Sequence, residues 1–184
     1  IDCAHPDVLD FIKLKTDLNK VTKANISIRL SNEFMEAVKE HKQFRLHFKR
    51  QETGQVIESL VNAADVFRLV ADYSEPGALF WDRIKSWNLL AHTPEFSFAG
   101  VNPCAEEPLP AGGSCLLGSM NLSNFVNDPF TPNATFDFDE FKRCVRIAVR
   151  ALNDVLEEGL PLHPLEEQRE SVKAWRQIGL GIMG

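Results

Sequence analysis

The residues of this sequence whose types could carry chemistry stand close together near its middle. Asn102, Cys104 and Glu106 place a thiol between a carboxamide and a carboxylate, each two positions from the next. By itself this pattern indicates little, because a free cysteine in a loop more often packs as a small apolar side chain. The residues that follow form a much more specific string over 107–123, which reads Glu-Pro-Leu-Pro-Ala-Gly-Gly-Ser-Cys-Leu-Leu-Gly-Ser-Met-Asn-Leu-Ser.

A second pattern with chemical meaning is the glycine string that begins at Gly179 and reads Gly-Leu-Gly-Ile-Met-Gly. It matches G-x-G-x-x-G, the fingerprint of dinucleotide binding, which needs a strand before it, a helix after it and an acidic residue about 20 positions later. In the sequence given, no helix and no acidic residue follows Gly184. We therefore expect a tight glycine-rich strand against which another backbone packs closely. A nicotinamide-binding oxidoreductase is the alternative that this motif leaves open.

Composition and charge exclude several classes of protein. The 184 residues are 44% hydrophobic and 25% charged, as in an ordinary soluble globular protein. The net charge of -6 offers no basic footprint for nucleic acid. No apolar run reaches the roughly 18 residues that a membrane helix needs, and the first residues do not form a signal peptide. We therefore expect a cytoplasmic protein without a nucleic-acid or membrane partner.

The cysteines and histidines do not have the spacing of a metal site. Cys3, Cys104, Cys115 and Cys144 are widely separated, and the five histidines form no ligand pattern. Cytosolic thiols stay reduced unless they take part in redox chemistry. We expect Cys144 to pack on a helix and His5 to cap a helix start.

The periodicity of apolar residues predicts helices alternating with strands, which is typical of an α/β fold. Residues 91–133 are rich in proline and glycine and read as a long irregular segment, a type that is often functional. Strands are predicted over 25–30, over 44–48 and over 55–57, the last two joined by a turn at 52–54. Helices are predicted from Pro6, from Ser31 or Asn32, from Asn62, over 79–90, from Asp137 to Gly159, and over 165–175. So few strands would leave sheet edges uncovered, which indicates that this chain is part of a larger protein.

The string around Cys104 resembles the catalytic finger-loop region of the large subunit of ribonucleotide reductase. Residues 1–12, 25–28, 75–84 and 176–184 resemble further blocks of that family, in the same order. The resemblance covers the whole chain. It implies that residues 1–184 form a central section of the family's ten-stranded α/β barrel, with the finger loop at about 100–115 and the glycine string as a barrel strand.

The resemblance also implies roles for four residues. Cys104 would become a transient thiyl radical that takes the 3′ hydrogen of the ribose, and a nearby carboxylate would help by disfavouring its thiolate. Glu106 would be the general base for the 3′ hydroxyl, and Asn102 would hydrogen-bond the sugar hydroxyls. Cys115 would be one half of the redox-active disulfide, with its partner upstream of this sequence. A disulfide between Cys104 and Cys115 is not expected.

The branch of the family implies the cofactor. Pro103, between Asn102 and Cys104, is typical of the adenosylcobalamin-dependent branch, whereas many oxygen-dependent relatives carry leucine there. The alternative is a radical supplied by a diiron or dimanganese partner subunit. The substrate implied is a ribonucleoside diphosphate. A thioredoxin- or glutaredoxin-type reductant, nucleotide effectors bound elsewhere and a homo-oligomeric complete enzyme are implied as well.

Several parts of a complete reductase do not occur in this sequence. They are the upstream redox cysteine, the specificity loop, the substrate-phosphate loop and a C-terminal cysteine pair. We therefore expect this chain alone neither to close the barrel nor to turn over substrate, and to need the remainder of the enzyme. The alternative from another functional class is a non-catalytic module that serves assembly.

Overall fold

The computed structural model describes residues 1–16, 21, 23–73 and 75–184. The chain divides into two compact units, which are described one at a time. Unit 1 comprises Ile1–Phe96 and Val101–Pro108, and unit 2 comprises Ser97–Gly100 and Leu109–Gly184. Two short strands lie where the chain passes between the units, β5 (Gly100–Val101) and β6 (Pro108–Leu109).

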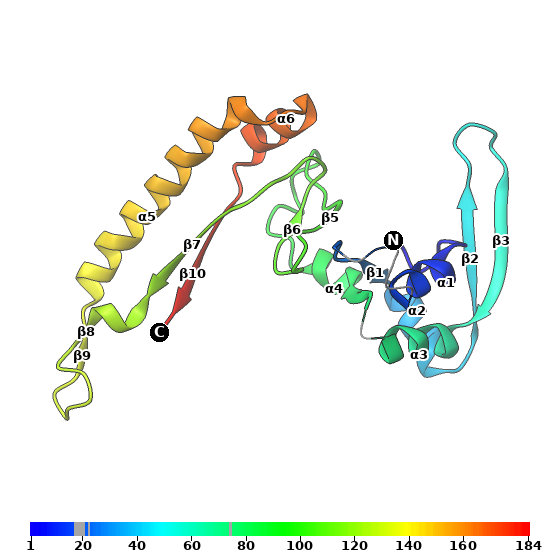
Figure 1. Ribbon diagram of the computed structural model, residues 1–184, viewed down its shortest axis with the longest axis horizontal. Coiled ribbons are helices and arrows are strands. Elements are labelled where there is room, and N and C mark those ends of the chain that lie inside the picture. The colour runs from blue at the N-terminus through cyan, green and yellow to red at the C-terminus, as the bar shows by residue number, and fades with distance from the viewer. Residues whose placement is uncertain (17–20, 22, 74) are drawn as a thin grey trace. The chain divides into compact units, whose positions relative to one another are not determined.

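Unit 1 is built on a parallel pair of strands and an antiparallel hairpin (Figure 1). Its elements in chain order are α1 (Val8–Ile12), a 3₁₀ turn (Lys13–Thr16), β1 (Ser27–Leu30), α2 (Asn32–Lys39), β2 (Gln43–Lys49), β3 (Val56–Asn62), α3 (Ala63–Tyr73), β4 (Gly77–Phe80) and α4 (Trp81–Ser86). Strand β1 pairs with β4, with Ser27 opposite Gly77. Parallel strands need a long crossover, and here it carries α2, the β2–β3 hairpin and α3. The predicted α/β character is therefore confirmed.

The core of unit 1 lies where α1, α2 and α3 meet the strands. Phe34 of α2 is fully buried and packs edge-to-face on Phe44 of β2, with 5.0 Å between the ring centroids. Burying a side chain of this size stabilises the fold by about 1.5–3 kcal/mol. The buried residues of this core are Cys3, Val8, Ile12, Ile28, Leu30, Phe34, Ala37, Phe44, Leu46, Ala63, Val66 and Val70.

Local capping explains where several elements of unit 1 begin. The Ser31 hydroxyl accepts a hydrogen bond from the Phe34 N–H at 3.1 Å, as expected for the residue that starts α2. The Asn62 side chain accepts one from the Asp65 N–H at the start of α3. His5 does not cap α1 as predicted: its Nδ1 accepts from the Asp7 N–H at 3.1 Å, but Asp7 precedes the first helical residue, and α1 begins without a side-chain cap.

One predicted helix of unit 1 is wrong at its beginning. Leu79 and Phe80 were expected on a helix over 79–90 but belong to β4, and the helix that follows is only Trp81–Ser86. Leu79 is 8% exposed and Phe80 is 43% exposed, the alternation of a strand. A short apolar run does not distinguish strand from helix, and here pairing with β1 decides.

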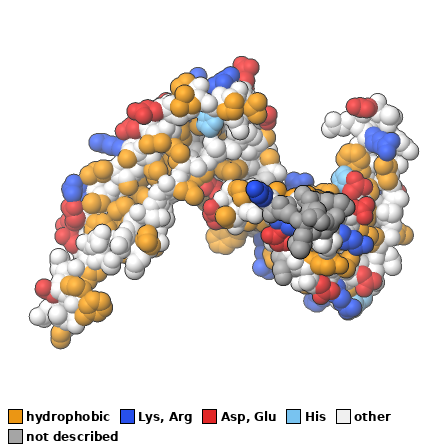
Figure 2. Space-filling view, viewed as in Figure 1, with side chains coloured by type: hydrophobic (Ala, Val, Ile, Leu, Met, Phe, Trp, Pro, Cys, Tyr) orange, Lys and Arg blue, Asp and Glu red, His pale blue; other side chains and the backbone are white. Residues whose placement is uncertain are grey.

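Unit 2 combines a second parallel pair with one long helix. Its elements in chain order are β7 (Leu116–Asn121), a 3₁₀ turn (Leu122–Phe125), β8 (Val126–Asn127), β9 (Thr135–Phe136), α5 (Phe138–Gly159), a 3₁₀ turn (Leu160–Leu162), α6 (Glu166–Trp175) and β10 (Ile178–Met183). Strand β7 pairs with β10, with Leu116 opposite Ile178. Figure 2 shows charged side chains along the outer edge of α5 and hydrophobic side chains between this helix and the strand pair.

The helix α5 confirms the prediction over 137–159. The Asp137 side chain accepts a hydrogen bond from the Glu140 N–H at 2.9 Å and so caps the first turn. Phe141 packs against Phe125, with 5.3 Å between the ring centroids. At the far end, Arg176 bonds two side chains of α5, with its Nη2 at 2.6 Å from Asn153 Oδ1 and its Nη1 at 2.6 Å from Glu157 Oε1. These contacts fix the direction in which the chain leaves α6 and enters β10.

The strand β7 lies in the segment that the sequence indicated to be irregular. Its residues do not alternate between polar and apolar, so its pairing with β10, far along the chain, determines it. The glycine string of β10 is a strand, as expected. A Cβ at Gly181 would lie 3.3 Å from the side-chain Oγ of Ser119 and 3.7 Å from the Gly118 carbonyl oxygen of β7, so the tight contact is with a side chain and the backbone lies at an ordinary van der Waals distance. The nicotinamide alternative does not fit, because Gly179 and Gly181 lie within β10, whereas the fingerprint places its glycines in the turn between a strand and a helix.

The strands of the described residues pair two by two and do not close a barrel. Both parallel pairs, β1–β4 and β7–β10, therefore have unpaired edges, which agrees with the expectation of a partial barrel section. Among the described helices, none has the length and apolar character to cross a bilayer.

Candidate functional site

The segment 102–107 of unit 1 is a loop closed by Asn102. The Asn102 N–H donates to the Glu107 carbonyl at 3.1 Å, and Asn102 Oδ1 accepts from the Glu107 N–H at 3.0 Å. The Asn102 carbonyl accepts from the Ala105 N–H at 2.9 Å, which makes a β-turn over 102–105. One residue therefore ties both ends of the loop and shapes its turn.

Cys104 occupies the tip of this turn. Pro103 precedes it and fixes the backbone φ at the second position of the turn, where proline is favoured. Ala105 follows with φ of 65°, a left-handed conformation that a residue with a Cβ seldom adopts. The thiol is exposed and forms no disulfide. The turn thus presents a free sulfur on a short, conformationally restricted segment.

Glu106 is the next side chain that the same loop presents. Both Cys104 and Glu106 are exposed, and the turn separates them by Ala105 alone. The predicted trio of Asn102, Cys104 and Glu106 is therefore gathered in one closed loop of unit 1. Asn102 Oδ1 accepts the hydrogen bond that closes the loop, and Nδ2, the donor of the carboxamide, is the group that can donate to a bound hydroxyl.

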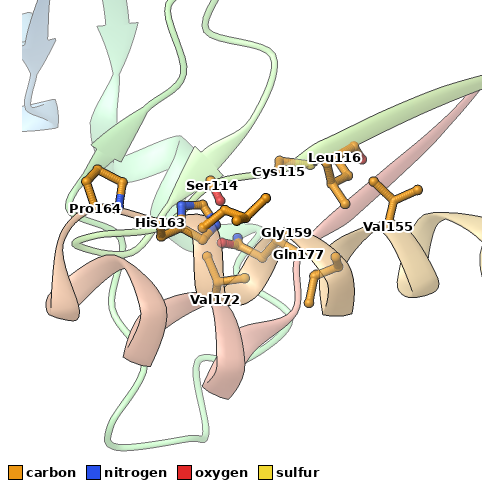
Figure 3. A pocket seen from close by; sticks show the side chains of 11 residues that line it. Ser114, Cys115, Leu116, Val155, Gly159, His163, Pro164, Val172 and Gln177 are labelled. Carbon is orange, nitrogen blue, oxygen red and sulfur yellow. Dashed lines mark hydrogen bonds between the residues drawn. The ribbon is translucent and has the colours of Figure 1, made fainter.

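Cys115 belongs to unit 2, just before β7. It is half-buried, and its Sγ donates to the Leu116 carbonyl at 3.5 Å. The residue lines a pocket of about 350 Å³ (Figure 3). The other lining residues come from the start of β7, α5, α6 and their connections: Ser114, Leu116, Val155, Leu156, Gly159, Leu162, His163, Pro164, Val172 and Gln177.

Two glycines of the string before Cys115 have a structural role that sequence reasoning missed. Gly112 has φ of +66°, and a Cβ there would lie 2.9 Å from the Glu167 carbonyl oxygen of α6. A Cβ at Gly113 would lie 2.9 Å from the Pro110 carbonyl oxygen, which accepts a hydrogen bond from the Gly113 N–H at 3.0 Å. The chain can therefore turn against α6 and enter β7 only because these residues lack side chains.

Replacing Gly112 by alanine is expected to destabilise unit 2 by about 1–3 kcal/mol, since it combines a left-handed φ with a backbone clash. Urea unfolding of the chain measures this loss. The matched control is Gly159→Ala in the last turn of α5, where a Cβ meets nothing within 4 Å. That change should be neutral or slightly stabilising. Equal effects of the two substitutions would contradict the steric role of Gly112.

The two remaining cysteines are placed for packing. Cys3 is 1% exposed, and desolvation by burial raises the pKa of its thiol. Cys144 lies on α5, half-buried, and donates from Sγ to Glu140 Oε1 at 3.4 Å. Desolvation and this hydrogen bond raise the pKa of the Cys144 thiol. Arg143 hydrogen-bonds the same carboxylate and, together with Cys144, lowers the pKa of Glu140 to about 2.

These placements predict an order of thiol reactivity. With iodoacetamide at pH 8, Cys104 is expected to react first and at least about tenfold faster than Cys3, because the thiolate is the reacting species and Cys3 is buried. Peptide mass spectrometry of the alkylated chain measures each rate. In denaturant the four rates should converge. Equal rates for Cys3 and Cys104 in the folded chain would contradict the exposed position of the Cys104 thiol.

The described residues contain no group of three His, Cys, Asp or Glu side chains that could hold a metal ion.

Comparison with known proteins matches the chain over its whole length. A family model described as the ribonucleotide reductase barrel domain matches residues 1–184. A protein named vitamin B12-dependent ribonucleoside-diphosphate reductase from Mycobacterium tuberculosis is 31% identical over 189 residues, covering 100% of this chain and 26% of the relative. One of the same name from Thermoplasma acidophilum is 31% identical, covering 98% and 23%. A ribonucleoside-diphosphate reductase large chain from Encephalitozoon cuniculi is 25% identical, covering 98% and 26%. The chain thus spans about a quarter of the length of these relatives.

Proposed function

The chain belongs to the ribonucleotide reductase barrel-domain family, and on this premise we propose that it carries the catalytic loop of an adenosylcobalamin-dependent ribonucleoside-diphosphate reductase. The observation that carries the proposal is the closed loop 102–107, which presents a free thiol and a carboxylate within a chain matched from end to end. The names of the relatives at 31% identity support both the cofactor and the diphosphate substrate.

Cys104 is the residue that exchanges a hydrogen atom with the substrate. As a thiyl radical it takes the 3′ hydrogen of the ribose, so that an S–H bond forms and the unpaired electron moves to the 3′ carbon. The same hydrogen returns to that carbon at the end of the cycle, which regenerates the thiyl radical. The exposed position at the tip of the turn, outside any disulfide, is what this exchange requires.

Glu106 takes the 3′ hydroxyl proton while the substrate radical is present, which lets the 2′ hydroxyl leave as water. Asn102 closes the loop and donates through Nδ2 to the sugar oxygens. Cys115 and a cysteine outside this chain supply two electrons and two protons, one proton going to the departing 2′ hydroxyl and the other to the sugar, and become a disulfide as the 2′ carbon is reduced. A thioredoxin- or glutaredoxin-type protein then restores the two thiols.

The Cys104 thiol fits a radical generator that acts from outside the chain, because its sulfur is exposed and forms no disulfide. Adenosylcobalamin, when bound, supplies the radical that removes the hydrogen of this thiol. Pro103 supports this choice over a diiron or dimanganese partner subunit, since it gives the Asn-Pro-Cys order of the cobalamin-dependent branch.

Large apolar side chains on both units support a role within a larger enzyme. In unit 1, Trp87 is 82% exposed and Leu89 is 88% exposed. In unit 2, Ile182 of β10 is 68% exposed and Leu117 of β7 is 62% exposed. These faces and the unpaired strand edges are the surfaces that the remainder of the barrel covers. Nucleotide effectors bind elsewhere in the complete enzyme, which we propose to be a homo-oligomer.

The test is reduction of a ribonucleoside diphosphate by the enzyme that contains this chain, with and without adenosylcobalamin. Activity that needs the cofactor and a thiol reductant supports the proposal. Activity that persists without the cofactor and needs a metal-containing second subunit would overturn the choice of radical generator. Retention of full activity when Cys104 is replaced by serine would overturn the catalytic role itself.

A further inference from the structure

Asn25 joins the Cys104 loop to the scaffold of unit 1. Its Nδ2 donates to the Pro103 carbonyl at 3.1 Å, across 78 positions of sequence. Pro103 immediately precedes Cys104, so this carbonyl belongs to the peptide group that also contains the Cys104 nitrogen. A contact with this oxygen therefore constrains the plane from which the Cys104 side chain departs.

Asn25 lies just before β1, a strand that backbone pairing and burial hold in place. The neighbouring Ile26 carbonyl accepts from the Gly77 N–H at 2.9 Å, where the β1–β4 pairing begins. Further along β1, Ile28 and Leu30 are 0% and 1% exposed. Strand β1 is thus fixed by backbone pairing and by burial, and Asn25 lies two positions before its first residue, Ser27.

The loop makes hydrogen bonds of two kinds, internal ones and one to Asn25. The bonds from Asn102 to Ala105 and to Glu107 are all internal to the loop, so they determine its shape and not its position on unit 1. The bond from Asn25 instead connects the loop to β1. We propose that Asn25 is a positioning residue, which holds the Pro103–Cys104 peptide and thereby directs the Cys104 thiol toward the substrate. This inference rests on the proposed function of Cys104.

The experiment compares two isosteric substitutions in the complete enzyme that contains this chain. Asn25→Asp removes the Nδ2 donor and places a carboxylate oxygen against the Pro103 carbonyl. Asn88→Asp, also in unit 1, introduces the same charge but keeps Oδ1, which accepts from the Leu90 N–H at 3.0 Å. We expect Asn25→Asp to lower kcat about 10- to 100-fold with KM within about twofold, the effect of a misplaced reacting group. Asn88→Asp should leave both constants unchanged.

Two further measurements keep the outcomes distinct. Thermal unfolding of each variant separates positioning from stability, and Asn25→Asp should unfold at the wild-type temperature.

Cys104→Ser in the same activity assay tests the function on which the inference rests. If Cys104→Ser is inactive and Asn25→Asp matches Asn88→Asp in kcat, the positioning role is overturned and the proposed function stands. A lower unfolding temperature for Asn25→Asp with unchanged kcat would make Asn25 structural and overturn the inference. An active Cys104→Ser enzyme would overturn both.

Discussion

Replacing Cys104 by serine is expected to abolish ribonucleotide reduction, with a loss of at least about 1000-fold in kcat, equivalent to about 4 kcal/mol in the barrier. A serine O–H bond is much stronger than a thiol S–H bond, so the side chain cannot give up its hydrogen and recover it reversibly. Serine is nearly isosteric with cysteine, and position 104 is exposed at a turn. Folding and assembly should therefore be unchanged, and the assay of deoxyribonucleotide product against thermal unfolding measures both.

The matched control for this substitution is Cys144→Ser on α5. Cys144 makes its contact with Glu140 through a hydrogen bond that a hydroxyl can also donate. Activity within about twofold of wild type is expected from this variant, since a hydroxyl of similar size keeps the contact and Cys144 is not among the predicted site residues. A fully active Cys104→Ser enzyme would instead favour the alternative in which the chain only assists assembly, because a structural module needs no thiol at this position.

Replacing Glu106 by glutamine is expected to lower kcat by about 100- to 10,000-fold, the range for loss of a general base. A carboxamide keeps the size of the side chain and can accept a hydrogen bond, but it cannot take the 3′ hydroxyl proton. The KM should change little, because the loop geometry is set by Asn102 and the backbone of Glu107, and not by the Glu106 side chain. Steady-state kinetics of the complete enzyme provide this measurement.

Glu107→Gln is the control one position away. The backbone N–H and carbonyl of Glu107 both bond to Asn102, and the substitution leaves them in place. The two variants remove the same charge from the same loop, so a general electrostatic effect would lower kcat equally in both. A large loss of kcat in Glu106→Gln alone supports the general-base role of Glu106. Equal losses of kcat in Glu106→Gln and Glu107→Gln would contradict that role.

Some elements follow from local sequence because their residues satisfy one another over a few positions. Asp137 caps the start of α5 and Ser31 the start of α2, as their types predict, and α5 ends at Gly159, where the helix was expected to end. The motif around Cys104 is local as well, since Asn102 closes the loop onto Glu107, five positions away. For this reason the sequence alone predicts that Asn102, Cys104 and Glu106 lie in one loop.

Other features depend on partners far along the chain, and there local pattern misleads. Phe80 fits a helix by spacing but lies in β4, because β1 pairs with it. Leu116 falls in a segment rich in proline and glycine but begins β7, because β10 pairs with it. Gly112 and Gly113, just before β7, must lack side chains because a Cβ would clash with the Glu167 carbonyl of α6 at Gly112 and with the Pro110 carbonyl at Gly113. No neighbouring residue in the sequence indicates this requirement.

The sequence by itself determined the family and the α/β class, and it predicted the loop around Cys104, because a distinctive string and short-range capping both depend on neighbouring positions. Only the tertiary structure decided that Asn25, 78 positions from Pro103, contacts the peptide that bears Cys104. The physical reason is that a hydrogen bond between distant segments depends on where the backbone carries each partner. Neither the asparagine nor the proline carbonyl has any local feature that marks it as half of such a pair.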